Sequence, residues 1–210
     1  GYLPIGALPH VTNPPEEYFG TANNYMVPDG YPYLNALHYT WGDEMRAARV
    51  NEVLRSGRRH TIIDMMRLQQ DELSVPAKNL IPFLRGLTLN DPTADDARRR
   101  LLRWDAVLDR DSIDAAIYVS WERRLLQNLR VLLVPESIRD LLGGLNMKKV
   151  INWLAAPDGR FGPDPIEGRD RLLAESMEQA LEDLRTRLGP DQTQWHYGQP
   201  DFKHALIRHP

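Results

Sequence analysis

The chain has 210 residues, a formal net charge of −3 and ordinary shares of hydrophobic (42%) and charged (26%) residues. This length allows one domain, or one and a half, with a sizeable core, and the composition excludes disordered, collagen-like and membrane-spanning classes. The small negative charge favours no nucleic-acid partner, and the absence of cysteine excludes disulfides, thiolate metal sites and a cysteine nucleophile.

The N-terminal segment is predicted to be extended. Residues 1–15 contain four prolines, which cannot continue a regular helix. Aromatic and other strand-forming residues at 18–21 and 25–27 favour two short strands. Asn23 and Asn24 between them are typical of a turn. The sequence therefore predicts a strand, a turn and a second strand.

Helical periodicity begins near Asp43 and continues to about Leu188. Its strongest stretch has an apolar residue at every fourth position from Ile113 to Leu129, in a helix that Pro135 should end. The expected helical segments are 43–57, 62–70, 74–86, 91–104, 112–135, 137–142, 147–154 and 169–188.

Local signals mark the starts of several of these helices. Thr61 and Asp64 have the spacing of a capping box, and Ser74 and Ser112 are good N-cap residues. Pro82 should kink or divide the helix that starts at Ser74.

The C-terminal third contains one predicted loop and a strand-like tail. Residues 156–168 are rich in Pro, Gly and Asp, which predicts a loop, and residues 202–207 favour a strand. The predicted fold class is mainly α with short β segments at both ends (α+β). The expected parts are an extended or β segment (1–42), a helical body (43–190) and a returning β segment (191–210).

Three N-terminal motifs resemble a known family. They are the stretch from Asn13 to Asn24, the Tyr31-Pro32 pair and the stretch from Trp41 to Arg46. Together they resemble the penicillin acylase family of N-terminal nucleophile hydrolases, in which an N-P-x-x-G segment leads to an asparagine pair. Glu17 departs from this pattern because the family usually has glycine there.

The C-terminal end carries the same resemblance. In this family a helical excursion returns to the central sheet through a W-x-x-G segment and a strand ending in H-P-L. Residues 195–198 read W-H-Y-G and residues 209–210 read H-P, which fits that return. The resemblance implies that the chain is the helical portion of an αββα N-terminal nucleophile hydrolase.

The resemblance also implies an activity and its partners. The family's nucleophile is a Ser, Thr or Cys at the start of its large chain, whereas this chain begins with Gly1, which has no side chain to attack with. We therefore expect an internal fragment of the large subunit, inactive alone, whose partners are the remaining segments of the same precursor. The whole enzyme would hydrolyse the amide of a small N-acyl substrate, such as a β-lactam, and would be periplasmic or secreted.

Asn23 and Arg46 are the catalytic candidates that the resemblance implies. The amide of Asn23 would donate to the oxyanion, a role that suits a neutral donor that does not titrate. Arg46 would hold that amide through its carbonyl oxygen and lower the pKa of the nucleophile's α-amine, which acts as the base. From local sequence alone, Asn23 is also typical of a turn, and Arg46 of a solvated arginine near a helix start.

Asn35 is the metal candidate. The family often carries a calcium site, and one of its carboxylate ligands corresponds to Asn35, three residues after the Tyr31-Pro32 pair. An amide oxygen can coordinate calcium but removes a charge, so a turn or capping role for Asn35 is the alternative. No cofactor is expected for the chemistry itself.

Other patterns point to structure. The acidic residues between Asp105 and Asp114 lack the glycine and glutamate of a calcium-binding loop and favour the start of the next helix instead. The histidines have no zinc-binding spacing. The alternative function for the whole chain is a helical interaction module without enzymatic activity.

Overall fold

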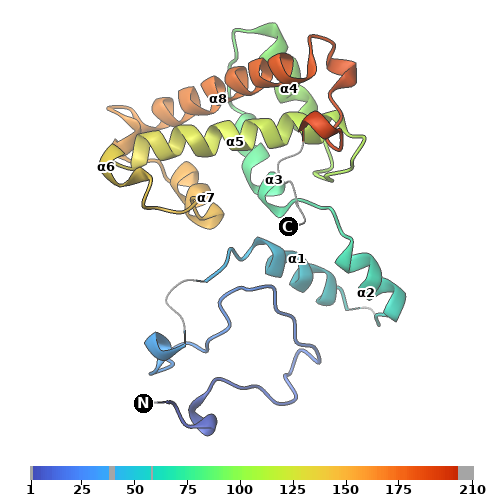
Figure 1. Ribbon diagram of the computed structural model, residues 1–210, viewed down its shortest axis with the longest axis vertical. Coiled ribbons are helices and arrows are strands. Elements are labelled where there is room, and N and C mark those ends of the chain that lie inside the picture. Colours follow the sequence, from blue (N-terminus) through green and yellow to red (C-terminus); the bar gives the residue numbers. More distant parts are fainter. Residues whose placement is uncertain (1, 38–40, 58, 203–210) are drawn as a thin grey trace, which may run out of the picture. The chain divides into compact units, whose positions relative to one another are not determined.

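The computed structural model describes residues 2–37, 41–57 and 59–202. By internal contacts the chain divides into two compact units, residues 1–71 and 72–210, and each is described by itself (Figure 1). The sequence-based boundaries at 42/43 and 190/191 divide the chain by expected secondary structure and not by internal contacts, so they stay predictions.

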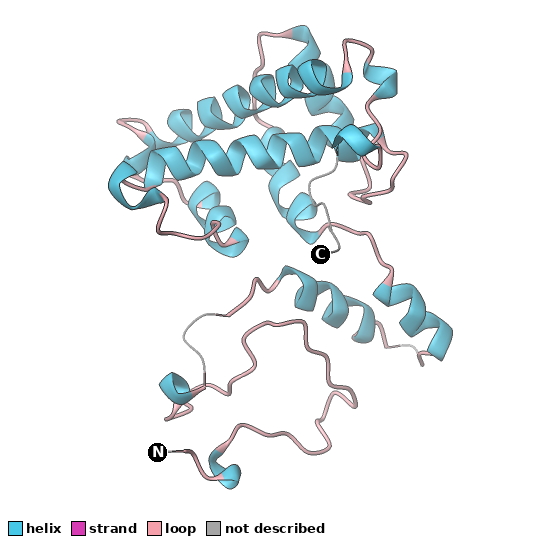
Figure 2. Cartoon of the chain, viewed as in Figure 1, coloured by secondary structure: helices cyan, strands magenta, loops and turns pink. Residues whose placement is uncertain are grey.

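The first unit has two helices and a long irregular segment (Figure 2). Helix α1 spans Met45–Leu54 and helix α2 spans Ile62–Gln69; the short 3-10 helices η1 and η2 span Ile5–Ala7 and Leu34–Ala36. The capping box predicted for α2 is confirmed, because Thr61 accepts from the backbone of Asp64 and Asp64 accepts in return from the backbone of Thr61.

The predicted strands differ most from the structure. Residues 18–21 and 25–27 form no strand, and the described residues contain only one isolated β-bridge, between Leu73 and Val107. Strand-forming side chains do not suffice, since a strand also needs a neighbouring strand for its backbone hydrogen bonds. The strand predicted at 202–207 lies outside the described residues except for Phe202, which ends a 3-10 turn.

The second unit is helical. Its longest helices, α5 (Ile113–Leu133) and α8 (Pro165–Leu188), lie side by side (Figure 1). They run antiparallel, because Asn128 of α5 bonds to Ser176 of α8 whereas Arg124, one turn earlier, pairs with Asp183. The other elements are α3 (Val75–Leu80), η3 (Ile81–Leu84), α4 (Pro92–Leu101), α6 (Glu136–Arg139), α7 (Met147–Ala155), η4 (Gly159–Phe161), η5 (Gln192–Gln194) and η6 (Pro200–Phe202).

Most predicted helix ends of this unit are confirmed. The hydroxyls of Ser74 and Ser112 accept from Ala77 and Ala115 and so cap α3 and α5. The α-helix that starts after Ser74 ends at Leu80 and continues as the 3-10 helix η3, which contains Pro82.

Helix α8 begins earlier than predicted. The loop expected at 156–168 ends at Asp164, whose carboxylate accepts from the backbone of Ile166 (3.1 Å) and Glu167 (3.0 Å). Pro165 fits the first turn because it has no N–H to leave unpaired there. Gly168 then lies inside the helix, where a Cβ would come within 1.9 Å of the carbonyl oxygen of Phe161. This glycine permits close packing, whereas the sequence pattern places it in a loop.

The core of the second unit forms between α5 and α8. The apolar stripe predicted for α5 is buried from Ile117 to Leu129. The fully or almost fully buried residues of the α8 stripe are Leu173, Met177, Leu181 and Leu184. Trp121 is completely buried, and its indole N–H donates to the carbonyl oxygen of Leu173. Within the described residues, no helix has the length and apolar character needed to cross a membrane.

The W-H-Y-G segment returns to the start of α5. Trp195 is buried, and its indole N–H donates to the carbonyl oxygen of Gly189. Gly198 donates its backbone N–H to the carbonyl oxygen of Arg110 over 2.6 Å, and a Cβ at Gly198 would also lie 2.6 Å from the Cβ of Arg110. Because the two segments approach this closely, only glycine fits at position 198, the last residue of the W-H-Y-G motif.

Candidate active site

The candidate site lies where the irregular segment of the first unit packs on α1. The segment runs antiparallel to this helix. The hydroxyl of Tyr18 donates to Oδ1 of Asn51 (3.0 Å), and Nε of Arg55 donates to that hydroxyl (3.0 Å). Further along, Gly20 faces Val50 so closely that a Cβ on the glycine would lie 3.0 Å from the valine Cγ1. The segment then reaches Asn23 near the start of α1.

Asn23 has a left-handed backbone conformation, with φ of 61°. Asparagine tolerates this conformation better than most residues, which agrees with the turn predicted here. The neighbouring Asn24 stabilises the turn, because its Oδ1 accepts from the backbone of Ala22 (3.1 Å) and its amide donates to the carbonyl oxygen of Tyr25 (2.9 Å). The side chain of Asn23 is exposed.

Arg46 contacts the amide of Asn23. Its Nη2 donates to Oδ1 of Asn23 (2.8 Å) and to the carbonyl oxygen of Ala22 (3.2 Å). A guanidinium only donates, so the amide must turn its carbonyl oxygen toward Arg46 and its NH₂ group away. The structure thus brings the two residues together, with an exposed N–H donor held in a defined direction.

Gly42 is a further part of the site, and its role is not predicted from the sequence. Its backbone N–H donates to the carbonyl oxygen of Asn23 (3.0 Å), and a Cβ on Gly42 would lie 2.6 Å from that oxygen. The Trp41 ring packs edge-on against Tyr25 at 5.2 Å. The Trp-Gly pair therefore holds the asparagine turn through a ring contact and a backbone hydrogen bond. Only glycine at position 42 allows the backbone to approach this closely.

Comparison with known proteins identifies the family. The family model described as penicillin amidase matches residues 1–210. The chain belongs to the penicillin amidase family. The family resemblance of the sequence motifs is thereby confirmed.

Curated relatives within this family are bacterial acylases. The chain is 26% identical to the acyl-homoserine lactone acylase QuiP of Pseudomonas putida, over 94% of its own length and 27% of the relative's. It is 30% identical to the penicillin acylase 2 proenzyme of a Pseudomonas strain, over 60% of its own length and 16% of the relative's. QuiP of Pseudomonas aeruginosa is 24% identical over 94% of the chain and 26% of the relative. The chain thus spans about a quarter or less of the curated relatives it matches.

The structure agrees with the glycine that the resemblance implies at the position of Glu17. Glu17 has φ of 59°, a left-handed conformation that glycine adopts without strain. Its backbone N–H closes a turn by donating to the carbonyl oxygen of Pro14 (2.9 Å). The departure therefore changes the cost of the turn and leaves Asn23 in place.

Asn35 lies in η2 with its side chain exposed. The described residues include no group of three or more His, Cys, Asp or Glu side chains that could hold a metal ion. The acidic residues before α5 and in its first turn have structural contacts: Asp114 pairs with Arg100 (2.7 Å), and Asp109 accepts from the backbone of Asp111 (2.8 Å). The calcium role of Asn35 stays a prediction.

An apolar cavity of about 310 Å³ is present in the same unit as Asn23. It is lined by Pro9, His10, Val11, Phe19, Met26, Val27, Pro28, Leu37 and Trp41. Its lining contains no carboxylate, hydroxyl or amine, and its one titratable group is the imidazole of His10, whose Nδ1 lies 2.9 Å from the carbonyl oxygen of Leu8. The chemically equipped part of the unit is the Asn23–Arg46 pair.

Proposed function

We propose that the full-length protein hydrolyses the amide bond between an acyl group and an amine, with Asn23 as an oxyanion donor and Arg46 as the residue that orients it. The observation that supports this proposal is the hydrogen bond from Arg46 Nη2 to Asn23 Oδ1, which leaves an exposed NH₂ group directed away from the arginine. Membership of the penicillin amidase family supports the reaction class.

The chemistry needs a donor of this kind. When a nucleophile attacks an amide carbonyl, negative charge develops on the oxygen, and a prepositioned N–H stabilises it. One such donor typically contributes about 2.7–4 kcal/mol to transition-state stabilisation. The side chain of Asn23 is neutral and does not titrate, so its contribution would not depend on pH. Arg46 would restrict the rotation of the amide before the substrate arrives.

In this proposal the nucleophile and its base lie in another segment of the precursor. By resemblance, we place the nucleophile at the N-terminus of a processed chain of the same precursor, where its own α-amine acts as the base. This amine has an unperturbed pKa of about 7.7–8.0 and can therefore accept a proton near neutrality. The 210-residue chain alone would then be inactive, and the remaining precursor segments would be its partners.

The proposed substrate is a small N-acyl compound, either a β-lactam or an N-acyl homoserine lactone. The names of the relatives support both, since they include a penicillin acylase and acyl-homoserine lactone acylases. Assays of the full-length enzyme with penicillin G and with homoserine lactones of increasing acyl length distinguish the two. A periplasmic or secreted location is part of the same proposal and can be tested by cell fractionation. The helical interaction module is not favoured by the family match.

Substitution of Asn23 tests the proposal. Asn23→Gly removes the donor and tolerates the left-handed backbone, which alanine would strain, whereas Asn23→Asp keeps the acceptor for Arg46 but replaces the NH₂ group with oxygen. We expect both variants to lower kcat by roughly 10²- to 10³-fold, with little change in KM.

The matched control is Asn152→Asp in α7, where the asparagine is exposed. It should retain normal kinetics, and the melting temperature of each variant is recorded alongside. Near-normal turnover in folded Asn23→Gly and Asn23→Asp enzymes would mean that Asn23 is only a turn residue, and the proposal would be withdrawn.

A further inference from the structure

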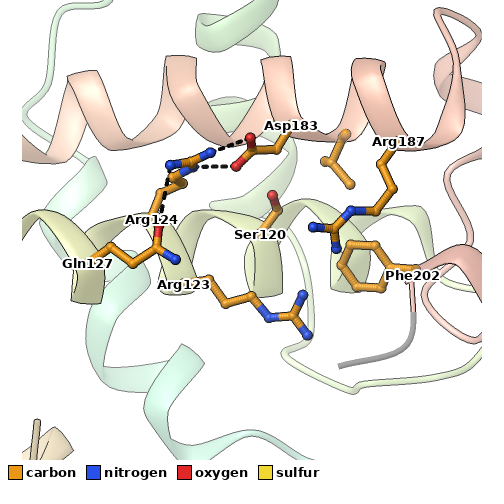
Figure 3. A pocket seen from close by; sticks show the side chains of 8 residues that line it. Ser120, Arg123, Arg124, Gln127, Asp183, Arg187 and Phe202 are labelled. Carbon is orange, nitrogen blue, oxygen red and sulfur yellow. Dashed lines mark hydrogen bonds and ion pairs between the residues drawn. The ribbon is translucent and has the colours of Figure 1, made fainter. Parts of the chain in front are cut away.

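A small polar cavity of the second unit lies between α5 and α8, and none of its lining residues belongs to the Asn23 site. Its volume is about 90 Å³, and Figure 3 shows its side chains. The lining residues are Ser120, Arg123, Arg124, Gln127, Asp183, Leu184, Arg187 and Phe202. Three of the eight are arginines, and one is acidic. The cavity is therefore rich in positive charge.

Only one of these arginines is neutralised within the cavity. Asp183 binds Arg124 through both carboxylate oxygens, and Arg124 also donates to Gln127 (3.3 Å). Among the residues drawn in Figure 3, no hydrogen bond or ion pair joins Arg123 or Arg187. The Nη2 atom of Arg123 is buried and, within the described part of the chain, has no hydrogen-bond partner. Buried donors in folded proteins are almost always paired, so this one indicates a missing acceptor.

The electrostatics of Arg123 agree with this interpretation. Burial lowers the pKa of its guanidinium and the positive charge of Arg187 lowers it further, whereas Tyr197 and Glu122 act in the opposite direction without reversing the shift. An arginine stays protonated despite such a shift, so the two like charges remain. The Phe202 ring lies 5.4 Å from the Arg123 guanidinium carbon and stabilises the cation, but it accepts no N–H hydrogen bond of ordinary strength. An anion between the two arginines would remove both costs.

The nearby polar groups are used for other contacts. The hydroxyl of Ser120 donates to the carbonyl oxygen of Ala180 (3.0 Å), and Glu122 accepts from the hydroxyl of Tyr118. Asp183 is engaged by Arg124. Among the residues that line the cavity, Asp183 is the one carboxylate, and Arg124 already occupies both of its oxygens.

We propose that Arg123 and Arg187 form a binding site for one small free oxyanion, of the carboxylate or phosphate class. The planar fork of a guanidinium matches the paired oxygens of both ions. A cavity of about 90 Å³ accommodates an ion of this size and excludes a peptide or a drug-sized ligand. Bound between α5 and α8, the ion would join the two longest helices of the unit and stabilise their packing.

Thermal unfolding of the full-length protein tests the site. Sodium phosphate and sodium acetate are titrated separately, with sodium chloride used to hold the ionic strength constant. Ligands that bind only the folded state raise the melting temperature in a saturable way. We expect a rise on the order of 2 °C with one or both oxyanions in the unsubstituted protein. Arg123→Gln and Arg187→Gln should each weaken the apparent affinity by about 10-fold or more.

Controls separate this site from general charge effects. Arg185→Gln is the matched control for Arg187→Gln. Arg185 lies on α8, as Arg187 does, and is exposed, but it pairs with Glu182 (2.9 Å). This variant should keep the full response. Arg123→Lys keeps the charge without the planar fork, should bind more weakly, and serves if Arg123→Gln fails to fold.

Three results would overturn the proposal. The first is a response that follows ionic strength alone, and the second is an equal response in all variants. The third is no response in the unsubstituted protein, which would indicate that a carboxylate of the longer polypeptide occupies the cavity. None of these results bears on the Asn23 site, because the two sites are tested with different variants and different measurements.

Discussion

The Nη2 atom of Arg46 bridges two acceptors, the side-chain oxygen of Asn23 at 2.8 Å and the main-chain oxygen of Ala22 at 3.2 Å. One atom of the first turn of α1 thus fixes both the backbone of the asparagine turn and the direction of its amide. The arrangement depends on the reach and shape of the guanidinium, since Arg46 is exposed and could otherwise extend into solvent.

The first prediction concerns Arg46→Lys in the full-length enzyme. A lysine keeps the charge but has a different reach and no planar group, so the Asn23 amide should rotate more freely. We expect kcat to fall roughly 10-fold with a small change in KM, since orientation of an oxyanion donor affects mainly the transition state. Arg67→Lys on α2 is the control, because that side chain is 78% exposed, and it should be silent. An unchanged kcat in Arg46→Lys would argue against the orienting role.

Gly42→Ala is predicted to displace Asn23. The added Cβ would lie 2.6 Å from the carbonyl oxygen of Asn23, so the backbone of the turn must shift. A forced shift of this kind costs about 1–3 kcal/mol of stability. It should also reduce kcat, because the Asn23 amide moves with its backbone. Gly6→Ala is the control in the same unit, where a Cβ meets no atom within 4 Å. Equal melting temperatures and kinetics for the two variants would contradict this prediction.

How far the sequence predicts the site can be judged from these three residues. Asn23 and Arg46 were found because they stand in family motifs, and the structure places them in contact. Gly42 stands in the same motif, but its role is not predicted, because it depends on a close approach between chain segments that composition and spacing do not encode. The sequence signal for this role is the Trp-Gly pair itself, since a glycine that is not part of a turn often marks a place where another backbone segment approaches closely.

The fold shows the same division between local and distant causes. Helix caps such as Thr61 and Ser112 involve residues three positions apart, so the sequence predicts them well. The strand predicted at 18–21 depends on a distant partner, and in the described residues that segment packs on α1 instead. The sequence pattern does not predict the start of α8, because Gly168 is typical of a loop, although Asp164 and Pro165 are a typical helix start.

Glu17→Gly is predicted to stabilise the protein. A residue other than glycine in the left-handed region costs roughly 1–2 kcal/mol, and the greater freedom of glycine in the unfolded chain offsets about 0.5–1 kcal/mol of the gain. With φ of 59° at Glu17, we expect a net stabilisation of up to about 1 kcal/mol, measured by urea unfolding. The neighbouring Glu16→Gly is the control: it lacks a positive φ and should destabilise or have no effect. A destabilised Glu17→Gly variant would contradict the strain argument.

Gly168→Ala is predicted to reverse the usual effect of this substitution in a helix. Glycine in a helix interior is ordinarily about 1 kcal/mol less favourable than alanine, so the exchange should stabilise α8 on propensity alone. At this position, however, the new Cβ would lie 1.9 Å from the carbonyl oxygen and 2.8 Å from the carbonyl carbon of Phe161. Because backbone cannot move aside as a flexible side chain can, we expect a loss of about 2 kcal/mol or more, seen as a lower urea midpoint with an unchanged m-value. The control is Gly159→Ala at the first residue of η4, where an added Cβ meets no atom within 4 Å; it should change stability by about 0.5 kcal/mol or less. A Gly168→Ala protein as stable as the original would show that the first turn of α8 packs less closely on Phe161 than the structure indicates.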